Sequence, residues 1–135
     1  MIIVDTNILI GIERGEISIK SYFEQYRKED FYISAISVQE LYVGLGYTKI
    51  KKGTEYYEKK KRILDAIIND FHVIEISEEI LKMAGLKQGE LLAKGLTVDI
   101  EDIILGISAE VMNAQKIFTK NRPHFEPFTI RCDSP

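Results

Sequence analysis

The sequence predicts an α/β fold in which helices cover both faces of a mostly parallel sheet. Short apolar runs of strand length alternate with longer segments whose apolar residues recur at helical spacing, an order typical of βαβ units. The 135 residues include 45% hydrophobic and 29% charged side chains, with no repeat and no low-complexity stretch. We therefore expect residues 1–135 to form a single domain around one core.

Each of the first two predicted strands is followed closely by a helix. Residues 2–5 form an apolar run that ends on Asp5, and a helix is expected over 6–13. Residues 31–34 form the second run, and a helix is expected over 37–45. In open α/β sheets, ligands bind at the edge where the carboxyl ends of the strands meet. The starts of these helices are therefore the first place to look for a site.

The spacing of apolar residues predicts the remaining elements. Alternation predicts a strand over 72–76, an apolar run predicts another over 115–119, and 128–131 is a further candidate. The segment 100–113 is apolar almost all round, so that helix is expected to be buried. The helices predicted from helical spacing cover 17–29, 54–70, 77–94 and 100–113.

The composition excludes some classes of function. The net charge of −3 disfavours a protein that coats nucleic acid through bulk charge, although a nucleic-acid enzyme can combine an acidic site with a basic patch. No apolar run approaches the roughly 18–20 residues of a membrane span, and the N-terminus lacks the pattern of a signal peptide. A single cysteine, Cys132, fits a reducing compartment. We expect a cytoplasmic protein that does not associate with membranes.

Three acidic residues stand at the beginnings of apolar helices. Asp5 ends the first strand, Glu40 follows the second, and Asp102 follows the strand-like segment 95–98. Clustered carboxylates repel one another unless a cation neutralises them, and carboxylate oxygens are the ligands that Mg²⁺ and Mn²⁺ prefer. The pattern therefore indicates a divalent metal site, which can activate water for phosphodiester hydrolysis.

Each acid also has a purely structural interpretation. Ser37-x-x-Glu40 matches a capping box, Asp5 suits an N-cap, and Asp99-x-x-Asp102 is a looser capping pattern. Capping alone does not require all three acids at one end of one sheet. Nor does it favour an Asp on the end of a core strand, where desolvation is costly. Taken together, the acids favour the metal site.

Four segments carry a family resemblance. They are Ile2-Ile3-Val4-Asp5-Thr6-Asn7-Ile8-Leu9-Ile10, Ser37-Val38-Gln39-Glu40-Leu41, Asp102-Ile103-Ile104-Leu105-Gly106-Ile107-Ser108-Ala109 and Ile117-Phe118-Thr119-Lys120-Asn121-Arg122-Pro123-His124-Phe125. Each is weak alone, but the four together, in this order and spacing over nearly the whole chain, are fairly specific. The sequence resembles the PIN-domain nucleases, and most closely the VapC-like toxins of prokaryotic toxin–antitoxin pairs.

The resemblance implies a three-layer α/β/α fold with a central, mostly parallel sheet of about five strands. It implies an endoribonuclease that depends on Mg²⁺ or Mn²⁺, with Asp5, Glu40 and Asp102 as the catalytic and metal-binding acids. Metal held by Asp5 and Asp102 would polarise the scissile phosphate of the RNA substrate, and Glu40 would orient the metal or the attacking water. The resemblance also implies a homodimer and a cognate antitoxin that covers the acidic groove.

Further residues are expected to support these acids. In many relatives a fourth acid stands where this chain has Asn121, which adds no charge and so argues against a tight second metal site. Asp99 is an extra carboxylate nearby, although an N-cap is its simpler role. Thr6 and Thr119 are expected to form hydrogen bonds to the acids. The two histidines are given no role.

A basic stretch over 49–62 is the candidate RNA contact. Lys59, Lys60 and Arg62 lie close to Tyr56 and Tyr57, and such side chains contact phosphates and stack on the bases of single-stranded RNA. The alternative is a solvated helix face whose tyrosines belong to the core or to a dimer interface. That ordinary interpretation is slightly favoured.

Three other functions fit parts of the pattern. A phosphatase of the haloacid-dehalogenase kind also begins with a strand ending in Asp, but it needs a second Asp where this chain has Asn7. A PIN nuclease of RNA processing would have the same site without being a toxin, and growth arrest on expression would separate the two. A non-catalytic PIN scaffold that binds RNA or protein would be expected to have lost at least one acid.

Overall fold

The sheet has five parallel strands in the order β3-β2-β1-β4-β5, so β1 lies at its centre. In the computed structural model, which describes residues 1–26 and 28–134, β1 (Ile2–Val4) pairs with β2 (Phe31–Ser34) and with β4 (Lys116–Phe118). The outer strands β3 (His72–Ile74) and β5 (Cys132–Asp133) pair in parallel with β2 and β4. The predicted α/β fold with a parallel sheet is confirmed.

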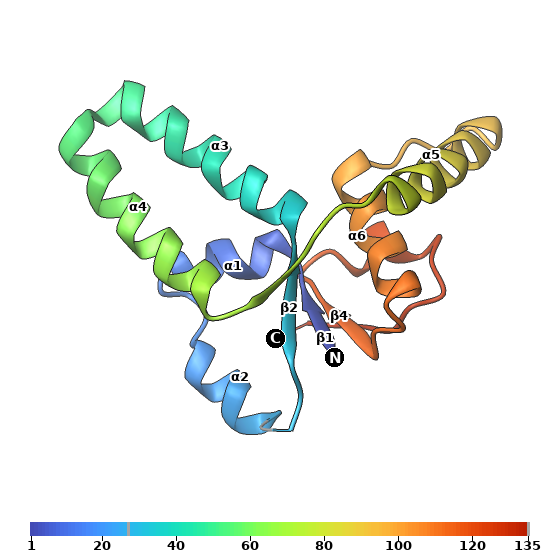
Figure 1. Cartoon of the computed structure of the whole chain (residues 1–135), viewed down its shortest axis with the longest axis horizontal. Helices are drawn as coiled ribbons and strands as arrows, with labels where there is room; N and C mark the ends of the chain where they lie inside the picture. The colour runs from blue at the N-terminus through green and yellow to red at the C-terminus, as the bar shows by residue number, and fades with distance from the viewer. Residues whose placement is uncertain (27, 135) are drawn as a thin grey trace.

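Helices lie on both sides of the sheet, which gives the expected three layers (Figure 1). One side holds α1 (Thr6–Glu13), α2 (Ile19–Gln25), α3 (Ala35–Lys52) and α4 (Thr54–Asn69). The other side holds α5 (Glu78–Ala93) and α6 (Ile100–Val111), and a short 3₁₀ helix, η1 (Arg122–Phe125), follows β4. Helices α3 and α4 form an antiparallel hairpin that extends away from the sheet (Figure 1).

Alternate side chains of β1 enter two separate cores. Ile2 and Val4 pack with residues of α1, α3 and α4, whereas Ile3 packs with residues of α5 and α6. This division follows from the two-residue period of a strand, whose side chains point alternately to the two faces. A strand covered on both faces reads as a continuous apolar run, as residues 2–4 do. In α6, every residue from Ile103 to Ala109 is buried, as predicted.

Helix α3 is twice as long as the sequence predicts. The expected helix covered 37–45, but α3 has 18 residues and begins after Ser34, whose side chain accepts a hydrogen bond from the backbone N–H of Ile36. Glycines 44 and 46 lower the helix propensity of this segment. The helix nevertheless continues, because Leu41, Leu45 and Thr48 are buried on the inner side of the hairpin. Packing outweighs local propensity here.

The expected strand over 128–131 is wrong. Phe128 is buried beside α6 instead, and the chain reaches the sheet edge only at Cys132, which pairs with Ile117. The helix expected over 17–29 is also shorter, since α2 covers Ile19–Gln25. The side chains of Ile19, Tyr22 and Phe23, and the whole of residue 27, lie outside the described residues. None of the described helices has the length and apolarity needed to cross a lipid bilayer.

We expect Gly106→Ala to lower the free energy of unfolding by about 1–3 kcal/mol, because an added Cβ forces overpacking in a tight core. Gly106 lies in α6, where a Cβ would meet the ring of Phe128 at 2.7 Å. Gly46→Ala in α3 is the matched control, since its Cβ would meet no described heavy atom within 4 Å. The control should gain up to about 1 kcal/mol from helix propensity. Urea unfolding measures both, and equal effects would contradict the packing argument.

Candidate active site

The three predicted acids lie at the carboxyl edge of the sheet. Asp5 directly follows β1, Glu40 lies in the second turn of α3 after β2, and Asp102 lies in the first turn of α6. The negative charge of Asp102 lies close enough to raise the pKa of both Asp5 and Glu40. The structure therefore brings together the three acids that the sequence singled out. Residues 95–98 form no strand, so Asp102 reaches this edge from a helix and not from a strand end.

Asp5 is a buried carboxylate that accepts hydrogen bonds from three donors at its own edge of the sheet. It is 7% exposed and is the N-cap of α1. Its Oδ1 accepts from the backbone N–H of Thr6 at 2.7 Å, and its Oδ2 accepts from the Thr119 hydroxyl at 2.7 Å and from Asn7 Nδ2 at 3.1 Å. Thr119 follows β4, the strand beside β1, so the sheet order itself places this donor.

Burial raises the pKa of Asp5 above its ordinary value of 3.8. The hydrogen bond from Thr119 opposes that shift, and the nearby charge of Asp102 adds to it. The donors around Asp5 fix its orientation, yet they do not fully compensate the loss of water around the charged form. A site with this balance favours any cation that can enter.

Glu40 is oriented by Thr6, as the sequence suggested. The Thr6 hydroxyl donates to Glu40 Oε1 at 2.7 Å, and the Thr6 hydroxyl oxygen also lies 2.9 Å from Ser37 Oγ. The capping box that was the alternative role of Ser37 and Glu40 is wrong, because Ser34 caps α3 and both side chains instead contact Thr6. Burial raises the pKa of Glu40, while the bond from Thr6 lowers it and the charges of Asp5 and other acids raise it.

Asp102 contacts His124, a residue to which no role was assigned from the sequence. His124 Nδ1 lies 2.8 Å from Asp102 Oδ2. Burial raises the pKa of Asp102, and the hydrogen bond and charge of His124 oppose that rise. His124 comes from η1, which packs on α6, and a contact between residues so far apart in sequence leaves no local pattern.

Asp99 is the N-cap residue of α6 and lies beside the site. It occupies the N-cap position, but within the described part of the chain its side chain makes no capping hydrogen bond. It lines a pocket of about 200 Å³ together with Thr97, Asp102 and His124. Its charge also helps to raise the pKa of Asp102. The predicted N-cap position of Asp99 is therefore confirmed, but its side chain does not cap the helix and instead lines the pocket beside Asp102.

Asn7 supports the site in a way that the sequence did not indicate. Its Nδ2 donates to Asp5 and lies 3.3 Å from the Thr119 hydroxyl, and its Oδ1 accepts from the backbone N–H of Lys120. Asn121 donates its backbone N–H to the Thr119 hydroxyl at 2.9 Å. Asn7 therefore ties α1 to the segment after β4, and Thr119 is held from both sides.

The donor chemistry of the site fits a hard divalent cation. The three carboxylates are partly desolvated and repel one another, and such oxygens are the preferred ligands of Mg²⁺ and Mn²⁺. Among the residues described, no three His, Cys, Asp or Glu side chains already stand close enough to enclose an ion. The fit therefore rests on the chemistry of the donors and not on a preformed cage.

Only one of the predicted RNA-binding residues lies near the acids. Lys60 of α4 lines a pocket of about 130 Å³ that also includes Glu40 and Arg14. Its Nζ lies 3.4 Å from the Thr48 hydroxyl and 4.0 Å from Glu13 Oε1. Lys59 and Arg62 are exposed elsewhere on α4. Of these three residues, Lys60 is therefore the one that shares a pocket with an acid of the site.

Comparison with known proteins gives consistent matches. The model of the family described as the PIN domain matches residues 2–126. Ribonuclease VapC1 of Methanocaldococcus jannaschii is 26% identical over 125 residues, which cover 93% of this chain and 79% of that protein. VapBC2 from Rickettsia felis, solved bound to a DNA fragment from their promoter, has a TM-score of 0.83 at 22% identity, covering 99% of this chain and 98% of the other. A toxin–antitoxin complex from Klebsiella pneumoniae has a TM-score of 0.68 at 24% identity, covering 93% and 91%.

We expect Asp5→Asn to gain stability relative to the wild-type protein as the pH rises. The folded wild type holds the Asp5 proton more tightly than the unfolded chain, where the pKa is near 3.8. The wild type therefore loses stability as the pH rises from that value through the raised pKa of the folded state, whereas Asn does not titrate. Urea unfolding of both proteins from about pH 4 to 8, in EDTA, measures this difference.

Asp70→Asn, at the exposed C-terminal end of α4, controls for the loss of one charge. A difference between Asp5→Asn and wild type that stays constant with pH, or that shifts in favour of the wild type, would contradict the assigned burial effect.

Proposed function

The chain belongs to the PIN domain family, and on that premise we propose that it is a metal-dependent endoribonuclease that hydrolyses RNA phosphodiester bonds. The observation that supports this proposal is the convergence of Asp5, Glu40 and Asp102 at the carboxyl edge of the sheet, where burial raises the pKa of each. The resemblance to a protein named as a ribonuclease supports the choice of RNA as substrate.

The residues divide the work according to their contacts. Asp5 and Asp102 would hold Mg²⁺ or Mn²⁺, which when bound lowers the pKa of a water and stabilises charge on a phosphate. Thr119 and Asn7 fix the orientation of Asp5. Glu40, oriented by Thr6, is placed to orient an attacking water or accept its proton. Asn121 contributes its backbone N–H to Thr119 and adds no charge to the site.

His124 is in competition with any cation at Asp102. While its Nδ1 engages Asp102 Oδ2, that oxygen is occupied. Because the side chain is about half exposed, the ring is free to turn away without breaking the core. We propose that the hydrogen bond between His124 and Asp102 belongs to the metal-free state and keeps Asp102 from lying unpaired.

We further propose that the protein is the toxin of a toxin–antitoxin pair, acting as a homodimer and neutralised by a cognate antitoxin. The support is its structural likeness to the VapBC2 complex and to the toxin–antitoxin complex described above. A free acidic site favours a partner that brings a positive charge, because an arginine pairs strongly with carboxylates.

We expect Mn²⁺ to bind the wild-type protein in a saturable way and Asp102→Asn to bind it at least about tenfold more weakly, because loss of even a supporting partner costs a metal site 10–100-fold. Isothermal titration calorimetry of the metal-free proteins measures this without knowledge of the substrate. Glu126→Gln, an exposed acid in the C-terminal segment, is the matched control. Absence of saturable binding by a folded wild-type protein would contradict the metal site.

We expect Asp5→Asn to fold normally and to cleave RNA at least about 100-fold more slowly in Mg²⁺ or Mn²⁺, since loss of a ligand exceeds the cost of losing its supporting partner. Expression of the wild-type protein should arrest bacterial growth, and expression of Asp5→Asn should not. Cleavage by Asp5→Asn at the wild-type rate would refute the mechanism. Wild-type cleavage without growth arrest would leave the nuclease in place and refute the role as a toxin.

A further inference from the structure

The far end of the α3–α4 hairpin has a charge opposite to that of the rest of the chain. We call residues 47–62 the distal hairpin; it extends away from the sheet (Figure 1). It contains seven basic and only two acidic side chains, although the whole chain has a net charge of −3. The basic residues are Lys49, Lys51, Lys52, Lys59, Lys60, Lys61 and Arg62.

Large apolar side chains are exposed among these charges. Tyr47 is 66% exposed, Ile50 83% and Tyr56 56%. Lys51 Nζ lies 5.9 Å from the ring centroid of Tyr47, and Lys52 Nζ lies 4.9 Å from that of Tyr56. Lysine side chains and tyrosine rings therefore lie next to one another on the surface of the distal hairpin, and neither ring is part of a hydrophobic core.

Structural roles account for part of this pattern and not for the rest. Lys49, Lys51 and Lys52 stand in the last turn of α3, where a positive charge stabilises the helix. Of the seven basic residues, only Lys60 and Lys61 form ion pairs within the described chain. Neither effect explains why Tyr47 and Tyr56 are displayed to solvent beside them. The rings require a separate reason.

The distal hairpin is connected to the acidic site by a single rigid helix. Glu40 stands near the start of α3 and Lys49 to Lys52 at its end, so at 1.5 Å per residue they are separated by about 14–18 Å along the axis. Between them, Lys60 of α4 lines the same pocket as Glu40. A flexible anionic chain held at the acids can therefore continue along the hairpin. It would first meet the positive charge of Lys60 and then the lysines at the end of α3.

We propose that the distal hairpin binds single-stranded RNA that flanks the bond to be cut. The lysines contact its phosphates, and bases stack on Tyr47 and Tyr56. Unpaired bases have free faces for such stacking, and aromatic residues interleaved with cations bind single strands without demanding a sequence. The proposal rests on the proposed function insofar as RNA is the substrate of the acidic site. It adds a second contact surface, distant from the chemistry, that sets affinity.

An anionic membrane is a weaker candidate for this surface. A helix that lies in a membrane interface needs a broad apolar face. In the hairpin that face is already used, because Leu41, Leu45, Leu64 and Ile67 are buried in the core. On the distal hairpin, the large apolar side chains that remain exposed are Tyr47, Ile50 and Tyr56, two rings and one isoleucine among cations. This composition suits stacking better than insertion.

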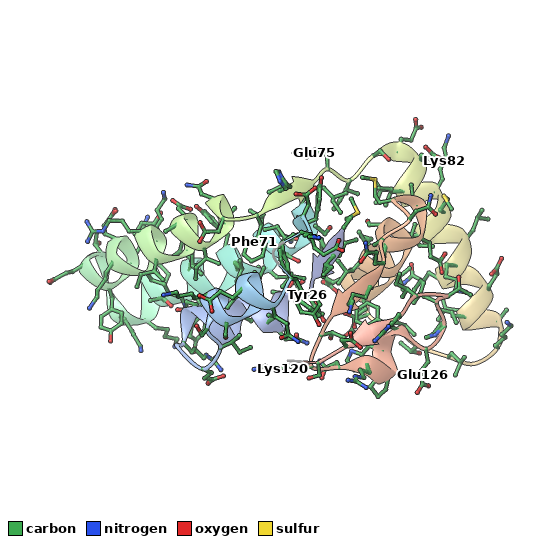
Figure 2. All side chains as sticks on the ribbon, turned by 90° about the horizontal axis from the view of Figure 1, so that it is seen from below. Tyr26, Phe71, Glu75, Lys82, Lys120 and Glu126 are labelled. Carbon is green, nitrogen blue, oxygen red and sulfur yellow. The ribbon has the colours of Figure 1, made fainter. Side chains whose placement is uncertain are left out.

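The first test is the salt dependence of RNA binding. The combined variant Lys49→Gln, Lys51→Gln, Lys52→Gln should bind a fluorescent 20-nucleotide single-stranded RNA more weakly than wild type in EDTA, where no cleavage occurs. Because each phosphate contact on a single strand contributes about 0.7 to the slope of log K against log salt, the slope should fall by about 2. The control is the combined variant Lys82→Gln, Lys87→Gln, Lys94→Gln, which removes the same number of positive charges. Two of these lysines lie in α5 and Lys94 directly follows it. Lys82 lies at the opposite end of the molecule from the hairpin (Figure 2). This control should leave the slope unchanged.

The second test separates stacking from charge. The double variant Tyr47→Ala, Tyr56→Ala should weaken binding at least about fivefold with an unchanged salt slope, because base stacking contributes affinity but no charge. The double variant Tyr47→Phe, Tyr56→Phe keeps both rings and should bind as the wild type does. Both tyrosines are exposed, so circular dichroism should find every variant folded.

The outcomes separate this proposal from the function on which it rests. If the lysine and alanine variants bind RNA as tightly as wild type, the distal hairpin is not an RNA surface, whatever the acids do. If they lose binding only to vesicles of phosphatidylserine and phosphatidylcholine, the surface belongs to a membrane. If they lose RNA affinity while binding Mn²⁺ normally, the proposal holds. Failure of wild-type Mn²⁺ binding would instead count against the acidic site alone.

Discussion

The structure depends on one costly feature, a carboxylate buried at the end of the central strand. A buried charge must be paired or hydrogen-bonded, and Asp5 meets that demand with three donors from two segments. Thr6 and Asn7 come from the helix that follows β1, and Thr119 comes from the end of β4. These donors fix the position of Asp5, but burial still raises its pKa. The fold therefore holds a carboxylate in place without neutralising it, which is the arrangement that a cation site requires.

The sheet order explains why the other acids join Asp5. Because β1 lies between β2 and β4, the segments that follow these neighbours emerge beside it. After β2 comes α3 with Glu40, and after β4 comes the loop that leads to His124. Asp102 arrives from α6, which packs against the other face of the sheet through Ile3. Both helical layers therefore contribute to one edge, and neither layer alone would assemble the site.

The sequence predicts the parts of this arrangement that have a local signature. A run of apolar residues that stops on Asp5 predicts both a buried strand and a constrained carboxylate, and helical spacing predicts α1, α4 and α6 closely. The pairing of His124 with Asp102 and the contact of Ser37 with Thr6 have no local pattern, because both join residues brought together only by the complete sheet. Asp99 shows the opposite failure. A capping pattern is present, but the side chain of Asp99 makes no capping hydrogen bond within the described chain. A local motif indicates which hydrogen bonds a residue is able to form, whereas the folded structure decides which of them are formed.

The length of α3 shows how an error in local prediction hides a functional relation. A helix ending at residue 45 would leave Glu40 and the basic residues 49–62 in separate elements, with no fixed geometry between them. In the structure one helix of 18 residues carries Glu40 near its start and Lys49, Lys51 and Lys52 in its last turn. The packing of Leu45 and Thr48 inside the hairpin allows α3 to continue past two glycines.

The net charge of −3 is the sum of two regions of opposite sign, which a rigid helix holds at a fixed separation. A charged polymer of negative sign is repelled by the acids until a cation occupies them, and it is attracted by the hairpin at all times. This asymmetry would allow the hairpin to hold a substrate before the acidic site is ready to act on it.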